Sequence, residues 1–182
     1  MIFGPPPIEP EILANTLVSE LAKTLREHVE SSRTTIVKDI LRRMGKERGH
    51  LVYPDSDSDH KAAQFLLDLV WWKNREEMDI VLAVESELGK RNEVCEDFGK
   101  LLVVKAPLKL MIFLRQPKDT VDIIEKSYMQ KYSQHVEGEH YLLIQLDTKK
   151  CEAHPFHFPV PLNGKLNAVN FRRLPIIEFH SH

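Results

Sequence analysis

Three acidic residues stand where the chain changes from apolar to polar. Asp68 interrupts the apolar run 65–72, and Glu85 and Glu87 directly follow the apolar run 80–84. A lone carboxylate among Phe, Leu, Val and Trp side chains costs several kcal/mol if it is buried without a partner. Asp68 should therefore lie at an open edge of the core or bind something. Glu85 and Glu87 are two positions apart in a predicted strand, so they share a face and lie about 7 Å apart.

The two apolar runs predict a hairpin that brings these acids together. A turn centred between positions 76 and 77 places Asp68 opposite Glu85, and the same register pairs Trp72 with Val81. Three clustered carboxylates repel one another unless a divalent cation neutralises them. Oxygen ligands of this kind suit Mg²⁺ or Mn²⁺, so we expect Asp68 and Glu85 to bind one of these ions.

A predicted helix over 93–104 carries Asp97 and Lys100, which lie three residues apart and therefore on one face. The Lys100 stem can lie along the packed surface while its ammonium reaches the acids. We expect its nitrogen roughly 3 to 6 Å from Glu85 or Glu87, where it would stabilise a developing anion or help orient a water nucleophile. Gly99 costs this helix roughly 1 kcal/mol relative to Ala, which suggests a close approach of the helix backbone to another element.

These motifs resemble those of the PD-(D/E)xK nuclease superfamily. The resemblance is carried by Leu67-Asp68-Leu69, by Glu85-Ser86-Glu87 and by Asp97-Phe98-Gly99-Lys100-Leu101-Leu102. It implies an α/β fold with a three-layer restriction-endonuclease-like core, in which a mixed central sheet is flanked by helices. It also implies that Asp68 and Glu85 are the metal ligands.

This chain departs from the family pattern in two places. Glu87 stands at the position of the family's Lys, so Lys100 is the candidate for a Lys that has moved to the next helix, and Leu67 rather than Pro precedes Asp68. Many relatives add a glutamate from a helix before the core. The candidates here are Glu20, Glu27, Glu30 and Glu47, and the sequence does not choose among them.

The resemblance implies a metal-dependent phosphodiester hydrolase that acts on nucleic acid, with DNA the favoured substrate. The missing Lys and the acidic charge balance keep open a second hypothesis, a catalytically inactive nuclease-like subunit used for binding or assembly. A third is a toxin or defence nuclease whose activity a partner masks.

The elements that must position these residues follow from apolar periodicity. It predicts a helix over 11–29, a second helix after Ser31-Ser32 that buries positions 36–44 and ends at Gly45 or Gly49, and further helices over 93–104 and after a cap at Asp119 or Thr120. Buried strands are predicted over 65–72, 80–84, 108–114 and 141–146. This order predicts a mixed sheet with helices on its faces. Pro155, Pro159 and Pro161 are expected to limit strand pairing in the tail.

Composition and charge limit the classes of protein to which the chain can belong. The chain has 182 residues, 25 Lys and Arg against 27 Asp and Glu, and 2 Cys. The charge balance excludes a generally basic nucleic-acid coat protein but not a local basic patch, and the Cys count excludes a disulfide-dense module. We expect one domain over 1–182, with N-terminal helices (1–49), a nuclease-like core (50–148) and a His/Pro-rich extension (149–182). No apolar run approaches the ~20 residues that span a bilayer. We therefore expect a cytoplasmic protein without a membrane segment, and a homodimer or protein partner stays open.

Other motifs favour plainer interpretations. Asp55, Asp57 and Asp59 imitate the start of a calcium loop, but His60 and Leu66 occupy the positions that require Gly and Glu, so we expect a polar loop. A zinc site in the tail is disfavoured, because Pro155 argues against a helical ligand face; its candidate ligands are Cys151, His154, His157, His180 and His182. Trp71 and Trp72 are expected to pack in the core and at its rim. A nuclease would need some basic clusters to contact the phosphate groups of the nucleic acid. The candidates are Arg42-Arg43-Lys46-Arg48, Lys149-Lys150 and Arg172-Arg173.

Overall fold

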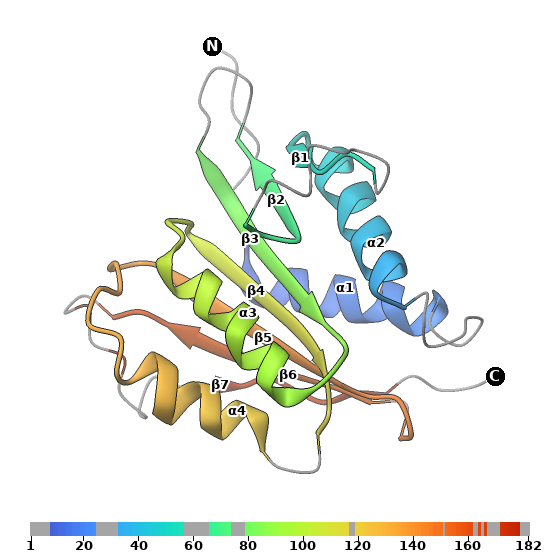
Figure 1. Ribbon diagram of the computed structural model, residues 1–182. Helices are drawn as coiled ribbons and strands as arrows, with labels where there is room; N and C mark the ends of the chain where they lie inside the picture. Colours follow the sequence, from blue (N-terminus) through green and yellow to red (C-terminus); the bar gives the residue numbers. More distant parts are fainter. Residues whose placement is uncertain are drawn as a thin grey trace.

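The computed structural model describes residues 8–24, 33–56, 66–73, 79–116, 119–150, 152–161, 164, 166 and 172–178. Within them an eight-stranded mixed sheet is covered by helices on both faces (Figure 1). The helices are α1 (Pro10–Thr24), α2 (Arg33–Glu47), α3 (Arg91–Val103), α4 (Thr120–Ile123) and the π-helix η3 (Ile124–Met129). The strands are β1 (Leu51–Tyr53), β2 (Leu69–Trp72), β3 (Ile80–Glu87), β4 (Leu108–Leu114), β5 (His140–Asp147), β6 (Glu152–Pro159), β7 (Arg172–Arg173) and β8 (Ile177–Glu178).

The strands lie in the order β1-β2-β3-β4-β5-β6, and β7 and β8 both pair with β6. β3, β4 and β5 run parallel to one another, whereas the other pairs are antiparallel. Parallel neighbours need a crossover, and α3 and the α4–η3 segment supply the two crossovers. The carboxyl ends of β3, β4 and β5 therefore meet at one edge of the sheet.

The predicted hairpin forms, with one correction. Leu69 pairs with Val84 and Trp71 with Leu82, which confirms the expected register. A bulge between Trp71 and Trp72 then shifts the pairing, so Trp72 lies opposite Ile80 and not Val81. The strand begins later than predicted, because 66–68 form a bend, and residue 65 lies outside the described residues.

Two apolar clusters fill the space between the sheet and its helices. Side chains of α1 and α2, including Leu17 and Leu41, pack on one face with Trp71 and Leu82. Side chains of α3, α4 and η3, including Phe98, pack on the other face with Tyr141. In Figure 1, α3 and α4 lie in front of the sheet and α1 passes behind it. None of the described helices has the length and apolar character needed to cross a membrane.

The prediction that prolines would limit pairing in the tail is wrong for β6. This strand pairs with β5 along its whole length, with Ile144 opposite Pro155 and His140 opposite Pro159. The Pro155 carbonyl accepts the Leu174 N–H, so the amide positions of Pro155 point away from β5. Because N–H and C=O of one strand residue point to the same side, the missing N–H costs the β5–β6 ladder nothing.

Candidate functional site

The predicted acids lie at the carboxyl end of β3, beside the start of α3. Crevices outside the carboxyl ends of parallel strands are common ligand sites in α/β proteins. Glu85 and Glu87 lie at the carboxyl end of β3, and Asp68 directly precedes β2. The geometry of this edge is set by the antiparallel β2–β3 pairing, which begins at Leu69 and Val84.

The Asp68 carboxylate joins two elements, α2 and β3. Its Oδ2 accepts a hydrogen bond from the backbone N–H of Ser86 in β3 at 2.9 Å, and its Oδ1 accepts one from Lys38 Nζ in α2 at 2.7 Å. The Asp68 side chain is 25% exposed and that of Lys38 is 21% exposed. We expected Asp68 either to lie at an open edge of the core or to bind something; its side chain is partly exposed and pairs with Lys38. The partner from α2 is a residue that the sequence did not single out.

Glu85 is buried on the α3 face of β3 and is only 1% exposed. Its Oε1 lies 3.4 Å from Lys100 Nζ but has no hydrogen-bond partner in the part of the chain that the structure describes. Burial, reinforced by the charge of Asp68, raises the pKa of Glu85 to about 8, although Lys100 opposes the shift. The Glu85 carboxyl is therefore largely protonated at neutral pH unless a further cation stabilises its ionised form.

Lys100 reaches Glu85 from α3, as predicted, and the same ammonium lies 2.6 Å from Asp97 Oδ1. Burial lowers the pKa of Lys100, but the hydrogen bond to Asp97 and the charge of Glu85 outweigh burial, so the net shift is upward. Lys100 is thus a fixed cation and not a proton acceptor at neutral pH. The interpretation of Gly99 is wrong, because a Cβ at that position would meet no atom within 4 Å.

Glu87 lies two residues beyond Glu85 and turns into the loop that leads to α3. Its Oε1 accepts the Gly89 N–H, and the Glu93 carboxylate caps the Lys90 N–H beside it. Burial, with the charges of Asp97, Glu93 and Asp68, raises the pKa of Glu87, although the Gly89 N–H opposes the shift. Glu87 therefore lies at the rim of the cluster, where Lys100 contacts Glu85 and Asp97 while Asp68 pairs with Lys38.

The described helix glutamates do not join this cluster. Glu20 and Glu47 both pair with Arg43, and Glu27 and Glu30 lie outside the described residues. The helix before the core instead contributes Lys38 to Asp68. Lys38 follows Val37, a buried residue of α2. This position next to a core residue was the only feature of the sequence that could have pointed to Lys38.

The basic side chains of the first cluster, Arg42-Arg43-Lys46-Arg48, form hydrogen bonds and ion pairs within the fold. Arg42 is 5% exposed and donates to Asp39 and to the Pro54 carbonyl, Arg43 pairs with Glu20, and Lys46 pairs with Asp55. These side chains stabilise α2 against its neighbours. Arg172 and Arg173 are exposed on β7, and Lys149 and Lys150 are exposed in the turn after β5, so these pairs remain available to phosphates.

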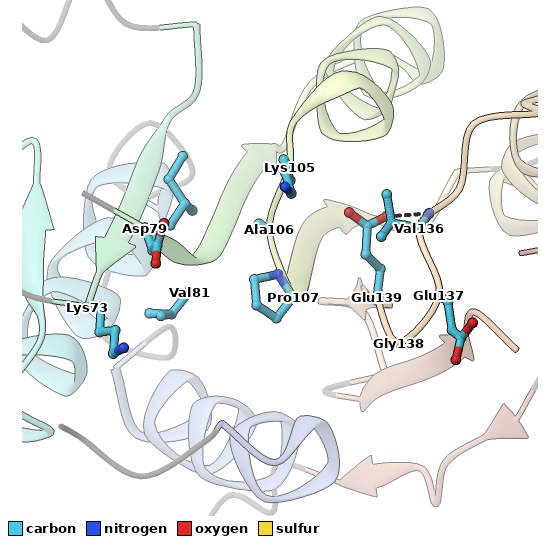
Figure 2. Close-up of a pocket in the computed structure, with 11 residues that line it drawn as sticks. Lys73, Asp79, Val81, Lys105, Ala106, Pro107, Val136, Glu137, Gly138 and Glu139 are labelled. Carbon is cyan, nitrogen blue, oxygen red and sulfur yellow. Dashed lines mark hydrogen bonds between the residues drawn. The ribbon is translucent and has the colours of Figure 1, made fainter. Parts of the chain in front are cut away.

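The opposite edge of the sheet, at the amino ends of the parallel strands, holds cavities that the sequence did not predict. One cavity of about 580 Å³ is lined by charged side chains from several loops, among them Lys73, Asp79, Lys105 and Glu139 (Figure 2). The Glu139 carboxylate that faces it is already bound by the Val136 N–H and by Lys109. No predicted site residue lines this cavity.

Comparisons of the chain with protein-family models, with curated proteins and with solved structures found no match. Function must therefore be argued from the site itself.

Proposed function

We propose that this protein is a metal-dependent phosphodiester hydrolase that acts on nucleic acid, with DNA the first substrate to test. The observation that carries the proposal is the charge balance around Glu85. Near the carboxyl end of β3, the carboxylates of Asp68, Glu85 and Asp97 outnumber the ammonium groups that pair with them, those of Lys38 and Lys100. The carboxylate left over is the buried one of Glu85, and its Oε1 has no hydrogen-bond partner among the described residues. A divalent cation would supply the missing positive charge.

The order of elements supports the resemblance to the PD-(D/E)xK superfamily. Helix α2 precedes three antiparallel strands, and α3 then crosses over to the parallel strand β4. Asp68 directly precedes the second of these strands, and Glu85 lies near the carboxyl end of the third, in the order of the family motif. The three-layer restriction-endonuclease-like core is part of this proposal.

The residues present fit Mg²⁺ or Mn²⁺, because carboxylate oxygens are the ligands these ions prefer. Asp68 and Glu85 would hold the ion, and each Asp68 oxygen keeps a free lone pair beside its hydrogen bond. When bound, such an ion lowers the pKa of a coordinated water and shields phosphate charge. Lys100, which Asp97 holds in place, would stabilise the anion that develops on the phosphate. Glu87, whose pKa is raised, would accept a proton from the attacking water.

The test is nicking of supercoiled plasmid in Mg²⁺ or Mn²⁺ against EDTA. We expect metal-dependent nicking, with a nicking rate at least about 100-fold lower in Asp68→Ala and in Glu85→Ala. Removing a metal ligand should lower activity at least as much as removing a residue that only orients a ligand. Glu96→Ala is the matched control, since Glu96 is exposed on α3 and contacts neither acid. Activity that persists in both acid variants would remove these residues from the mechanism.

The role of Lys100 is tested in the same assay. Lys100→Ala should lower the nicking rate by roughly 10- to 100-fold, because it removes the cation closest to Glu85. Lys105→Ala is the control, because Lys105 lines the cavity at the opposite edge of the sheet. Both variants should keep the far-ultraviolet circular dichroism of the parent. Equal rates for the two variants would show that Lys100 only balances charge.

A second candidate function has its own observation. Lys38 and Lys100 already pair with Asp68 and Asp97, so the cluster is partly neutralised without a metal. This arrangement favours a nuclease-like scaffold used for binding or assembly. Titration with Mn²⁺ separates the two functions: saturable binding that disappears in Asp68→Ala supports the hydrolase, and an absence of saturable binding supports the scaffold.

A further inference from the structure

A second group of polar side chains lies on one face of the β5–β6 hairpin, next to its turn. Asp147, the last residue of β5, lies opposite Glu152, the first residue of β6. The next pair on the same face is Gln145 opposite His154. Because strand residues two apart share a face, these four side chains form two adjacent cross-strand pairs. None of them belongs to the cluster around Glu85.

Three of these side chains are close enough to share one ion. Single ligand atoms of Asp147, Glu152 and His154 all lie within 4.8 Å of one another. His154 Nε2 is 3.1 Å from Glu152 Oε2. Two donors that bind one transition-metal ion at about 2.0–2.2 Å lie roughly 3.0–3.4 Å apart, so this pair needs little movement to accept an ion between them.

The Asp147 carboxylate is held in place by groups around it. Its Oδ1 accepts the backbone N–H groups of Lys149 and Lys150, and its Oδ2 accepts Arg115 Nη1 at 3.1 Å. Burial alone would raise the pKa of Asp147, but these donors outweigh burial and lower it. Asp147 is therefore ionised and oriented, as a metal ligand must be. The Arg115 side chain is 46% exposed and can move aside or stay bound to the carboxylate.

Gln145 is the independent sign of a ligand. Its side chain is 7% exposed and lines a cavity of about 270 Å³ together with His154 and Arg115. Within the described part of the chain its amide makes no side-chain hydrogen bond, and it opens onto that cavity. A bound ion, or a water held by that ion, would satisfy the Gln145 carbonyl oxygen.

We propose that Asp147, Glu152 and His154 form a binding site for a divalent transition-metal ion of the Zn²⁺ or Mn²⁺ class, with the Gln145 amide oxygen as a further ligand. The imidazole selects against Mg²⁺ and Ca²⁺, which prefer oxygen-only sites. Such an ion would tie the end of β5 to the start of β6. The site does not depend on the proposed nuclease activity, since the Glu85 cluster contains no imidazole.

This site differs from the zinc set weighed from the sequence. His157 lies three residues beyond His154 and so on the other face of β6, where its Nε2 is 2.9 Å from His140 Nδ1. Cys151, His180 and His182 lie outside the described residues. His154 is therefore the member of that set that the structure places with other ligands, and its partners are the two carboxylates.

The experiment titrates untagged full-length protein with Zn²⁺ by calorimetry and with Co²⁺ by visible absorption. The parent for the titration carries Asp68→Ala and Glu85→Gln, which remove the first site. We expect one ion per chain and a Co²⁺ spectrum that reports nitrogen ligation. In that background Glu152→Gln and His154→Ala should each weaken binding by at least about 10-fold, and Glu137→Gln at the opposite edge should not change it.

Thermal unfolding gives a second readout. Zn²⁺ should raise the melting temperature of the parent by mass action, and Glu152→Gln, which keeps the size of the side chain, should lose that rise. Binding that is equally tight in the Glu152 and His154 variants would overturn the proposal. So would an absence of saturable binding of either ion by the parent at millimolar concentration.

Discussion

At the scale of single residues, the site depends on one carboxyl group that the fold buries without a cation of its own. Lys38 pairs with Asp68 and Lys100 lies closer to Asp97 than to Glu85. Glu85 is left with an ion-pair contact that makes no hydrogen bond. A protein under selection for stability alone gains nothing from such a residue, because a buried carboxylate costs more than an apolar side chain of similar size.

Glu85 should make the metal-free protein less stable as the pH rises. Its folded-state pKa, about 8, lies above the ordinary value of 4.5, so the folded state holds a proton that the unfolded state releases between these values. The stabilising contribution of the protonated carboxyl is present below about pH 4.5 and is lost as the pH rises through 8. Glu85→Gln keeps a neutral group at every pH. In EDTA it should therefore raise the free energy of unfolding at pH 8.5 by up to about 5 kcal/mol, with little effect at pH 4.5.

Urea denaturation at the two pH values measures this difference. Glu96→Gln is the control, because Glu96 is an exposed glutamate of α3 and its replacement should change stability little at either pH. A Glu85→Gln variant that is no more stable than the parent at pH 8.5 would contradict the upward pKa shift. Saturating Mn²⁺ should reverse the order of stability at pH 8.5, because only the parent keeps the ligand.

At the scale of elements, the sequence predicted strands and helices correctly wherever a single apolar pattern determines where the element lies. β4 has the predicted bounds, and β5 is one residue longer at each end. Of the two cap candidates, Asp119 and Thr120, Asp119 caps α4 through a hydrogen bond from the Asp122 N–H. The approach of Lys100 to Glu85 was predictable because helix periodicity and the strand end fix both positions. These features depend on residues close in the chain or on a single pairing register.

The features that were missed depend on contacts that no local pattern specifies. Lys38 meets Asp68 across 30 positions of sequence, and the bulge after Trp71 arises within the hairpin ladder. β6 was missed because prolines usually break strands, whereas here the Pro155 ring faces the side away from β5. Gly99 was given a packing role because its low helix propensity suggested one, but the space beside it is open.

A buried ion pair links the segment before β5 to β4, and its loss should destabilise the fold. Lys109 is 2% exposed, and its Nζ lies 2.8 Å from Glu139 Oε2 and 3.2 Å from the Tyr141 hydroxyl. Lys109→Met leaves Glu139 buried without its cation, which should cost about 3–5 kcal/mol in urea unfolding. The double variant Lys109→Met/Glu139→Gln should recover part of that loss. A double variant as unstable as the sum of the single variants would show that the pair itself is not coupled.

At the scale of the whole molecule, the two helical layers approach the sheet differently. α2 lies so close to the sheet that a Cβ on Gly45 would be 2.6 Å from Val52 Cγ2 and 2.7 Å from Trp71 Nε1. Trp71 is fully buried, so its indole has no free space to move into. This close packing positions α2, and with it Lys38, against the strand end that carries Asp68. The opposite layer leaves Gly99 of α3 without such a neighbour.

Two glycine substitutions separate helix propensity from this packing. Ala is favoured over Gly inside a helix by about 1 kcal/mol, so Gly99→Ala should raise the free energy of unfolding by roughly that amount. Gly45→Ala receives the same gain, but its methyl group overlaps Val52 and Trp71, and overpacking costs typically about 1–3 kcal/mol. We expect Gly45→Ala to be destabilised in urea unfolding while Gly99→Ala is stabilised. Because the displaced helix also carries Lys38, Gly45→Ala should weaken the Lys38–Asp68 pair, whereas Gly99→Ala leaves it intact. If Gly45→Ala were as stable as Gly99→Ala, α2 would not be packed on Trp71 as closely as the structure has it.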